Sequence, residues 1–549
     1  MNIKKSYFIL SSFWNFYETP NSIFILKSLL EKKEVSPSRI MIFSLKDLIN
    51  KEKIKKIKKS DKDPVFFISV SQREKWKIKN IKKILIKLRK SFKESKIILG
   101  GPTITTAPGL FLKDKIADFI SLGEAEVSLP AILDYISKKR GIIVPNTYIL
   151  QNKKYIFAKA GETASLPEIY DSQKEVVNIF KKKSLLKEKE EKYINLEFSR
   201  GCKFSCSFCY EPLARRNLKI SPDRWLRALS PEKSCALLES AIESGCKKIF
   251  ITSNSLTSLP DFWMKNFLNC LNKVFKEKKL PLQNSVLRFA SCPVDFQRKT
   301  VKKFIRELSR YFYLFIDIGV ETLDKKTLEK FNKPHKKNLG KVINKITKLL
   351  LPLLKKNRLN FYPDLICIHP WITFGEIKKN ACFWHKCGLR MESYAGFFTQ
   401  HELWINNEDL DIAKKIKKER LFLKEKDGFG YNFAYGKKVR YPKNKKDSDI
   451  RRFIGFTEEL KNKIKEKFKL IRKEVEFQAN FEEILQECLK KKSLKEKDCL
   501  NKKICLYWLN VLKKAEQEWP KLTYREYKKE SQIEIKKFID ILKNDLNIF

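Results

Sequence analysis

The sequence predicts an α/β protein in three parts: an N-terminal parallel sheet, a central partial barrel and a helical C-terminal region. Short β-branched or aromatic runs alternate with amphipathic stretches over residues 1–140, and the alternation resumes over residues 191–400. Residues 401–549 are rich in lysine and glutamate and have helical periodicity. A chain of 549 residues is also too long for a single hydrophobic core.

The N-terminal part is predicted to be a Rossmann-like (flavodoxin-like) parallel sheet. Its expected strands are Ser6–Leu10, Arg39–Phe43, Val65–Val70, Lys96–Leu99 and Asp118–Leu122. Glycine turns follow the last two strands, at Gly100, Gly101 and Gly123. Open α/β sheets bind ligands at the carboxyl ends of their strands, and glycine lets the backbone approach a ligand closely. These glycines are therefore candidate ligand-binding residues.

Residues 141–190 are predicted to form a hairpin and a charged linker. The expected hairpin strands are Ile142–Leu150 and Tyr155–Lys159, with Gln151-Asn152 as the turn. Leu166–Tyr170 and a lysine and glutamate run over Lys181–Lys192 follow, as expected of a solvated tether.

Residues 191–400 are predicted to form a partial (β/α)6 TIM-type barrel. Its expected strands are Tyr193–Ser199, Lys248–Thr252, Ser285–Ala290, Tyr313–Ile318, Leu359–Ile366 and Glu392–Phe398. Its expected helices are Pro231–Ser244, Asp261–Glu277, Lys299–Tyr311, Lys337–Lys355 and Phe374–Lys386. Barrel enzymes build their sites at the carboxyl ends of the strands.

Cys202, Cys206 and Cys209 follow the first of these strands. Thiolates are the ligands of iron–sulfur clusters, and three of them would leave one iron of a [4Fe–4S] cluster open. A structural zinc site would need a fourth ligand. None is near, because the histidines are at 335, 369, 385 and 401 and the next cysteine is Cys235. A chance group of buried cysteines or a redox pair of Cys206 and Cys209 is the alternative interpretation.

The Cys-x3-Cys-x2-Cys pattern, with Phe208 before the last cysteine and Arg-Gly before the first, resembles the radical S-adenosylmethionine (SAM) superfamily. The Gly319-Val320-Glu321 and Ile368–Thr373 segments resemble later strand ends of that family. The resemblance implies that the amino and carboxylate groups of SAM bind the open iron. It also implies that the reduced cluster cleaves SAM to a 5′-deoxyadenosyl radical.

The same resemblance implies which residues would contact SAM. Phe208 would lie against the adenine side, and Ser253 and Asn254 would face the amino or carboxylate end. Glu321 would face polar groups near the ribose. Arg288 would bind the SAM carboxylate or merely balance the charge of Glu321.

Other candidate residues carry weaker signals. His369 is expected at a strand end, where it is a candidate acid or base. The later cysteines suggest an auxiliary cluster, but their spacing is loose for a cluster loop, so we interpret them as core residues. They are Cys382, Cys387, Cys488, Cys499 and Cys505.

The segments Leu99–Pro102 and Ser121–Glu124 resemble the cobalamin-binding domain that precedes many radical SAM cores. No histidine precedes His335, so the Asp-x-His-x-x-Gly loop that supplies a histidine ligand is absent. Cobalamin would therefore have no protein histidine ligand. The alternative is a scaffold domain without a cofactor.

Composition limits the partners and the compartment. The net charge of +52 is distributed along the whole chain, so a specific nucleic-acid substrate is not expected. Thirteen cysteines without a secretory leader predict a reducing, cytoplasmic location. No apolar run approaches ~18 residues, so no membrane span is expected.

These observations predict a radical SAM enzyme, most simply a cobalamin-dependent methyltransferase acting on an unactivated carbon or phosphorus. Its substrate would be a small molecule, lipid or peptide, and flavodoxin or ferredoxin would supply electrons. One alternative is a radical SAM mutase or cyclase whose N-terminal domain is only a scaffold. Another is a basic iron–sulfur protein that binds nucleic acid or senses redox state. A tRNA methylthiotransferase is disfavoured because no cysteine precedes Cys202.

Overall fold

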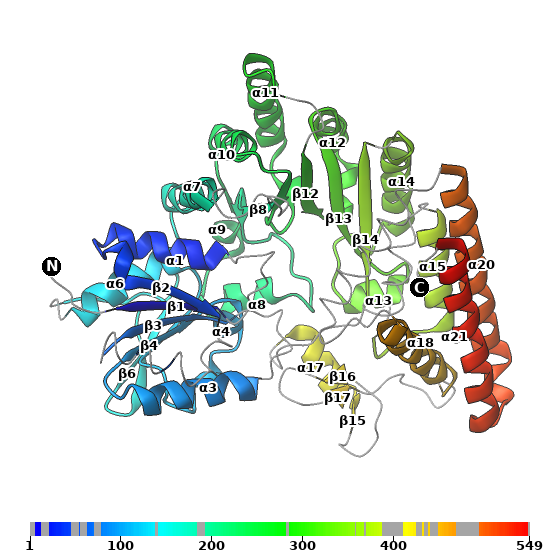
Figure 1. The fold of residues 1–549 in the computed structure, drawn as a ribbon, viewed down its shortest axis with the longest axis horizontal. Coiled ribbons are helices and arrows are strands. Elements are labelled where there is room, and N and C mark those ends of the chain that lie inside the picture. The colour runs from blue at the N-terminus through cyan, green and yellow to red at the C-terminus, as the bar shows by residue number, and fades with distance from the viewer. Residues whose placement is uncertain are drawn as a thin grey trace.

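The structure is a computed structural model of the whole chain. It describes residues 6–11, 21–44, 54, 57, 63–70, 78–137, 141–183, 193–280, 285–356, 358–366, 369–386, 410–423, 431–432, 438–439, 448–467 and 494–546. The N-terminal sheet, the central sheet and the C-terminal helices follow one another across the molecule (Figure 1).

The N-terminal part is built around a seven-stranded sheet with the order β2-β1-β3-β4-β5-β6-β7. Its strands are β1 (Tyr7–Ser11), β2 (Ile40–Ser44), β3 (Val65–Ser69), β4 (Lys96–Gly100), β5 (Phe119–Ser121), β6 (Thr147–Gln151) and β7 (Lys154–Phe157). The first five strands are parallel. Their order, 2-1-3-4-5, is that of a flavodoxin-like doubly wound sheet.

Helices cover both faces of this sheet. These helices are α1 (Asn21–Lys32), α3 (Ile78–Ser91), α4 (Pro102–Thr106), α5 (Gly109–Leu112) and α6 (Ala125–Ile136), with the short η1 (Pro37–Arg39) before β2. Leucines and isoleucines of α1 and α6 form one core on one face, and those of α3 form another on the opposite face. Because both faces are covered, the central strand β3 is buried at every position, as a parallel strand requires.

The hairpin belongs to this sheet and not to a linker, so a domain boundary at residue 140 would cut the sheet. β6 pairs with β5 and β7 pairs with β6, both antiparallel. The turn residues are Asn152 and Lys153, one residue later than predicted, and both have positive φ, as a type I′ turn needs. The expected linker is also partly helical, because α7 (Leu166–Lys183) is an amphipathic helix that packs against α1 and α10 (Pro231–Glu243).

The central part contains a five-stranded parallel sheet with the order β14-β13-β12-β11-β8. The strands are β8 (Tyr193–Leu196), β11 (Lys248–Ile251), β12 (Val286–Ser291), β13 (Tyr313–Glu321) and β14 (Leu359–Leu365). The main helices are α10 (Pro231–Glu243), α11 (Asp261–Glu277), α12 (Lys299–Tyr311), α14 (Leu339–Lys355) and α15 (Phe374–Lys386). The predicted sixth strand, Glu392–Phe398, lies outside the described residues.

The two faces of this sheet differ in chemistry. Alternate residues such as Ile249, Phe289 and Ile316 belong to the apolar core beneath the helices. The residues between them face the other side and include Arg288 and Asp317, which form an ion pair. Since side chains alternate along a strand, one face of the sheet is left to bind ligands.

The C-terminal region is helical, as predicted, but it also contains a small sheet. Its helices are α17 (Asp411–Lys418), α18 (Ser448–Lys467), α20 (Leu494–Gln517) and α21 (Tyr524–Leu546). The two-residue strands β15 (Phe422–Leu423), β16 (Tyr431–Asn432) and β17 (Lys438–Val439) pair antiparallel. α20 lies beside α15, and α21 lies beside α20, on the side of the central sheet away from the N-terminal domain (Figure 1). In the described part of the chain, no helix is long and apolar enough to cross a membrane.

Candidate active site

The three cysteines lie on the loop between the short strand β9 (Ser199–Arg200) and α8 (Tyr210–Asn217), which follows the first strand of the central sheet. Cys209 is the N-cap of α8. All three thiols are free and half-buried. In Figure 1, α8 lies between the N-terminal sheet and the central sheet, so the loop is near the junction of the two domains.

Gly201 explains why Arg-Gly precedes the first cysteine. Its φ is +83°, and an added Cβ would lie 2.2 Å from the backbone oxygen of Trp225. Trp225 ends α9 (Pro222–Trp225), directly before β10 (Arg227–Ala228), which pairs antiparallel with β9. Only glycine can pass this close to a neighbouring backbone at positive φ, so Gly201 determines the path of the chain into Cys202.

The middle of the loop is held by α13 (Lys325–Lys330) and α17. The Ser207 amide donates to the Phe331 carbonyl (2.9 Å), and the Ser207 hydroxyl donates to the Lys330 carbonyl (2.8 Å). The Ser207 carbonyl accepts from the Ile412 amide (3.0 Å). These bonds use both backbone groups of Ser207, so the loop is anchored between its second and third cysteines.

Burial keeps the three thiols protonated while they are free. It raises the pKa of Cys202 to about 11, with further contributions from Glu211 and Cys206. Burial also raises the pKa of Cys206, which the ammonium of Lys333 partly offsets, and that of Cys209. Both a cluster ligand and a redox-active cysteine act as thiolates, so either role requires these thiols to lose their protons.

Among the residues that the structure describes, no three His, Cys, Asp or Glu side chains converge on a single metal ion. A [4Fe–4S] cluster needs a different arrangement, because each thiolate binds its own iron and the thiolates surround a larger volume. Three free cysteines on one anchored loop fit that group.

Gly319 and Glu321, predicted as a Gly-x-Glu strand end, form a compact unit with Lys333. The Lys333 ammonium lies 3.0 Å from Glu321 Oε1, and both side chains are buried. A Cβ on Gly319 would lie 2.9 Å from the same Oε1, so glycine leaves room for the carboxylate. Glu321 has φ +65°, a conformation that non-glycine residues adopt mainly where surrounding contacts enforce it.

Ser253 and Asn254 follow β11 and hold the backbone around the cysteine loop. The Ser253 hydroxyl accepts a hydrogen bond from the Ser199 amide (3.0 Å) and is buried. The Asn254 amide donates to the Gly201 carbonyl (3.2 Å) and also lines the cavity described below. Ser253 is thus engaged with β9, whereas Asn254 lies where a ligand can reach it.

Arg288 and Phe208 make contacts that the sequence did not predict. Arg288 pairs with Asp317 on the neighbouring strand (Nε to Oδ2, 2.8 Å), whereas the ion pair with Glu321 is made by Lys333. The Phe208 ring packs against Phe331 at a centroid distance of 5.3 Å. The Lys333 ammonium lies 5.7 Å from the Phe208 ring centroid, which links the cysteine loop to the Glu321 unit.

His369 is fully buried, and both of its ring nitrogens are engaged inside the protein. Nε2 lies 3.0 Å from Glu376 Oε1, and Nδ1 accepts from the Trp371 amide (3.3 Å). Glu376 also accepts from the Thr322 hydroxyl. Through Glu376, His369 on the loop after β14 is connected to Thr322 on the loop after β13. His369 therefore has a structural role, and neither of its nitrogens is left for a substrate.

A cavity of about 480 Å³ lies between the N-terminal sheet and the central sheet. One side is formed by the carboxyl ends of β3, β4 and β5 together with α1 and α6, and includes apolar side chains such as Leu26 and Leu129. The other side contains Thr252 and Asn254 after β11 and the start of the cysteine loop. Ser199 is one of the lining residues, and its buried hydroxyl has no hydrogen-bond partner among the described residues. Such a buried polar atom indicates a place for a ligand or water.

The three predicted glycines all line this cavity, but for different reasons. A Cβ on Gly101 (φ +96°) would lie 2.8 Å from the Val70 carbonyl oxygen, so the sheet itself requires glycine there. Gly123 (φ +75°) faces Leu218 just after α8, with 3.0 Å between an added Cβ and the nearest Leu218 carbon. Only Gly100 has room for a side chain, since an added Cβ would meet nothing nearer than 3.8 Å.

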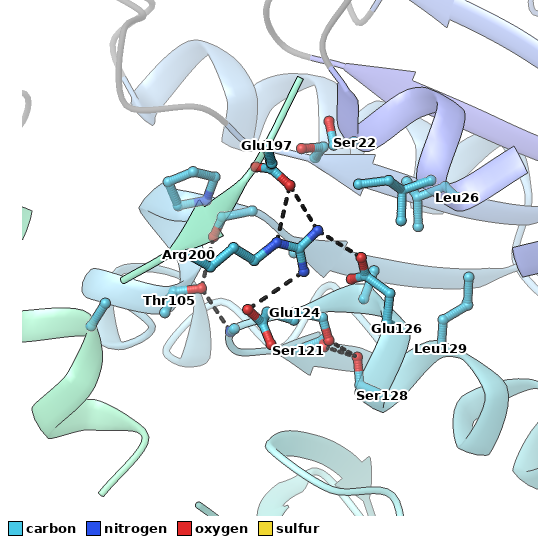
Figure 2. A pocket seen from close by; sticks show the side chains of 18 of the residues that line it. Ser22, Leu26, Thr105, Ser121, Glu124, Glu126, Ser128, Leu129, Glu197 and Arg200 are labelled. Atoms are coloured by element: carbon cyan, nitrogen blue, oxygen red, sulfur yellow. Dashed lines mark hydrogen bonds and ion pairs between the residues drawn. The ribbon is translucent and has the colours of Figure 1, made fainter. Parts of the chain in front are cut away.

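A cluster of charged residues crosses the cavity wall, and Figure 2 shows Arg200 at its centre. Arg200 donates to Glu197 and Glu126, each at 2.8 Å, and lies 3.5 Å from Glu124. Arg227 binds both carboxylate oxygens of Glu124 (2.7 and 3.0 Å). Although burial opposes ionisation of Glu124, the hydrogen bond from Arg227 and the charges of both arginines hold its pKa below the usual value.

Lys333, Glu211 and Arg200 belong to the site but were missed as site residues. Glu211 lines the cavity, and its carboxylate accepts a hydrogen bond from the Trp225 indole (2.6 Å). Burial raises the pKa of Glu211, and the charge of Glu211 in turn raises the pKa of Cys202. Arg200 and Glu211 lie within two residues of the cysteines, so their proximity was a usable signal. Lys333 had none, because it lies outside any motif and reaches the site only through the fold.

Two of the later cysteines, Cys382 on α15 and Cys499 on α20, are exposed, so the interpretation of these two as core residues was wrong. Cys387 and Cys488 lie outside the described residues, and Cys505 lies in α20.

Comparison with known proteins assigns the central part of the chain to a protein family. The family model described as the radical SAM superfamily matches residues 196–353, which run from β8 into α14. Residues 196–353 are therefore a radical SAM domain, as the cysteine motif predicted. No curated protein matches the sequence.

Solved structures extend the likeness to the whole fold. The cobalamin-dependent SAM radical enzyme OxsB, solved with aqua-cobalamin and SAM, is 16% identical with a TM-score of 0.62. The match covers 98% of this chain and 75% of that one. The radical SAM methyltransferase TsrM from Kitasatospora setae, with cobalamin and a [4Fe–4S] cluster, is 11% identical with a TM-score of 0.55, covering 80% and 82%. The chain thus has the fold of cobalamin-dependent radical SAM enzymes.

Proposed function

We propose that this protein is a cobalamin-dependent radical SAM methyltransferase. Cys202, Cys206 and Cys209 would bind a [4Fe–4S] cluster, and the cavity between the two domains would bind cobalamin. When bound, these cofactors would supply the electron that cleaves SAM and the methyl group that is transferred to an unactivated carbon or phosphorus. The substrate would be a small molecule, lipid or peptide, with flavodoxin or ferredoxin as electron donor.

The observation that carries this proposal is the composition of the cavity. Gly100 and Gly123, at the ends of β4 and β5, line the same cavity as Gly201 and Asn254 beside the cysteine loop. A flat cofactor on the N-terminal sheet would therefore face the side of the central sheet where SAM binds in this family. A cavity that joins the two parts favours a cofactor there over a domain that is only a scaffold.

The residues of the chain would bind and orient the cofactors and exclude water. Gly201 and Ser207 fix the cysteine loop through the backbone contacts described above. Lys333 holds the Glu321 carboxylate in place, and Asn254 offers an amide at the cavity wall. Apolar residues such as Leu26 and Leu129 would pack against the cofactor in the cavity.

The cluster is tested by anaerobic reconstitution with iron and sulfide. Wild type should bind about four irons per chain, with a broad absorption shoulder near ~400 nm, and the Cys202→Ala, Cys206→Ala, Cys209→Ala triple variant should lose both. A matched control replaces Cys270, Cys382 and Cys499, which lie outside the loop, and should keep its iron. Retention of all the iron by the first triple variant would refute the assignment.

The reaction is tested by incubating reconstituted protein with SAM, a reductant and hydroxocobalamin. A methyltransferase should form 5′-deoxyadenosine and S-adenosylhomocysteine, because one SAM provides the radical and another the methyl group. Formation of 5′-deoxyadenosine without cobalamin binding would favour the mutase or cyclase alternative. Formation of neither product would favour an iron–sulfur protein that is not an enzyme.

A further inference from the structure

Arg200 connects the two domains at a buried position. Its guanidinium donates to Glu197 on the segment after β8 (Nε at 3.0 Å and Nη2 at 2.8 Å). The same group donates to Glu126 in the first turn of α6, in the N-terminal domain (2.8 Å). Figure 2 shows these carboxylates, with Glu124, around one guanidinium. The side chain of Arg200 is only 12% exposed.

Glu126 is the carboxylate in this cluster that depends on Arg200. Glu126 is 2% exposed, and Arg200 is its ion-pair partner. Glu124 is bound on both oxygens by Arg227, and Glu197 is bound by Gln173 as well as Arg200. A buried carboxylate that loses its cation is strongly destabilised. The contact between Glu126 and Arg200 therefore favours the arrangement in which the N-terminal domain is packed against β9.

Arg200 is also only two residues from Cys202, and the residue between them cannot move freely. Gly201 passes against the Trp225 backbone, and β9 pairs with β10 at Arg200 and Arg227. A displacement of the Arg200 backbone would therefore displace Cys202. The cavity and the cysteine loop consequently share one structural element.

We propose that Arg200 couples the two cofactor sites, so that cobalamin in the cavity and the cluster on the cysteine loop stabilise each other. Cobalamin would contact both walls of the cavity and favour the packed arrangement of the domains. That arrangement pairs Arg200 with Glu126 and fixes the path into Cys202. Thermodynamic linkage requires the effect to be reciprocal. This inference rests on the proposed function, since it concerns how those two sites interact.

The test measures the Kd of hydroxocobalamin for iron-free and for anaerobically reconstituted protein, by titration of the cobalamin visible spectrum. Wild type should bind more tightly after reconstitution by at least about fivefold, the lower end of typical coupling between sites. In Arg200→Gln this ratio should fall to about one. Arg200→Lys should be intermediate, because lysine keeps the charge but lacks the planar fork that contacts several carboxylates.

A second measurement, which does not use binding spectra, is the rate at which a chelator removes iron from reconstituted protein. Excess hydroxocobalamin should slow iron loss in wild type and have no effect in Arg200→Gln. Arg89→Gln is the matched control, because Arg89 pairs with Asp118 inside the N-terminal domain and on the opposite face of its sheet. It should behave as wild type in both measurements.

Glu126→Gln provides a milder variant in case Arg200→Gln fails to fold, since glutamine keeps the size of the side chain and an acceptor oxygen. It should lower the ratio of the two Kd values in the same direction. Equal Kd values for iron-free and reconstituted wild type, or a wild-type ratio in Arg200→Gln and Glu126→Gln, would overturn the coupling alone. Failure of wild type to bind hydroxocobalamin at all would instead refute the cobalamin part of the proposed function, and the coupling with it.

Discussion

Replacing Gly201 by alanine tests how the cysteine loop is built. The alanine methyl would lie 2.2 Å from the Trp225 oxygen and 2.7 Å from its carbonyl carbon, and the φ of +83° would remain. The left-handed conformation costs an L-residue about 1–2 kcal/mol. Relief of the clash by backbone shifts adds about 1–3 kcal/mol, as for other overpacked sites. We expect the free energy of unfolding to fall by about 2–5 kcal/mol, which urea denaturation would measure.

The same substitution should affect the cluster more than the fold. Because the contact with Trp225 sets the path into Cys202, Gly201→Ala should bind clearly less iron than wild type at a temperature where both are folded. Gly340→Ala is the matched control, since Gly340 is exposed in α14 and an added Cβ would meet nothing within 4 Å. This variant should keep its iron, and its free energy of unfolding should rise by at most about 1 kcal/mol. Wild-type iron content and stability in Gly201→Ala would refute this account of the loop.

Four further predictions concern the binding of SAM, the pH dependence of stability, the binding of cobalamin and the binding of RNA. Gly319→Ala should displace the Glu321 carboxylate, which an added Cβ would approach to 2.9 Å, and raise the Kd for SAM by about tenfold in equilibrium dialysis. Burial lowers the pKa of His335 to about 4. Between pH ~6.5 and 4, the unfolded chain therefore binds a proton at this residue that the folded chain does not bind. Between pH 6.5 and 4 wild type should therefore lose about 3 kcal/mol of unfolding free energy relative to His335→Phe, measured by urea denaturation at each pH. Gly100→Leu should abolish cobalamin binding in spectral titrations with the fold intact, whereas Gly101→Leu should also lower the melting temperature, because an added Cβ has space at Gly100 but not at Gly101. Binding to unrelated RNA in filter assays should be weak and largely lost at ~200 mM salt; selective retention of one RNA would contradict the interpretation of the +52 charge.

Local patterns carried most of the prediction of secondary structure. Asp261–Glu277, Lys299–Tyr311 and Phe374–Lys386 are helices with the predicted bounds. Their apolar periodicity is strong, and such segments bury a face against any neighbouring sheet. The hairpin was predicted as a hairpin, but its membership of the sheet was missed, because pairing with β5 is a contact between segments that the local pattern does not encode.

The residues of the candidate site can be divided in the same way, into those that local patterns predicted and those that depend on contacts between distant segments. The cysteines, Gly319 and Glu321 are close in sequence to strand ends, and the carboxyl ends of parallel strands meet at one edge. Arg288 was recognised, yet its partner Asp317 was not, because the choice among several carboxylates on neighbouring strands depends on register. His369 had the position of a catalytic residue and turned out to be buried against Glu376.

The sequence by itself determined the ligand type and spacing from which we propose a [4Fe–4S] cluster, because these are local properties of twelve consecutive residues, Ser199–Tyr210. It also determined the α/β class and the position of the glycine turns. The tertiary structure alone decided that Gly100 and Gly123 line one cavity with Gly201, and that Lys333 neutralises Glu321. It alone revealed that Arg200 joins Glu126 to the cysteine loop, because residues 74 positions apart meet only when two domains pack.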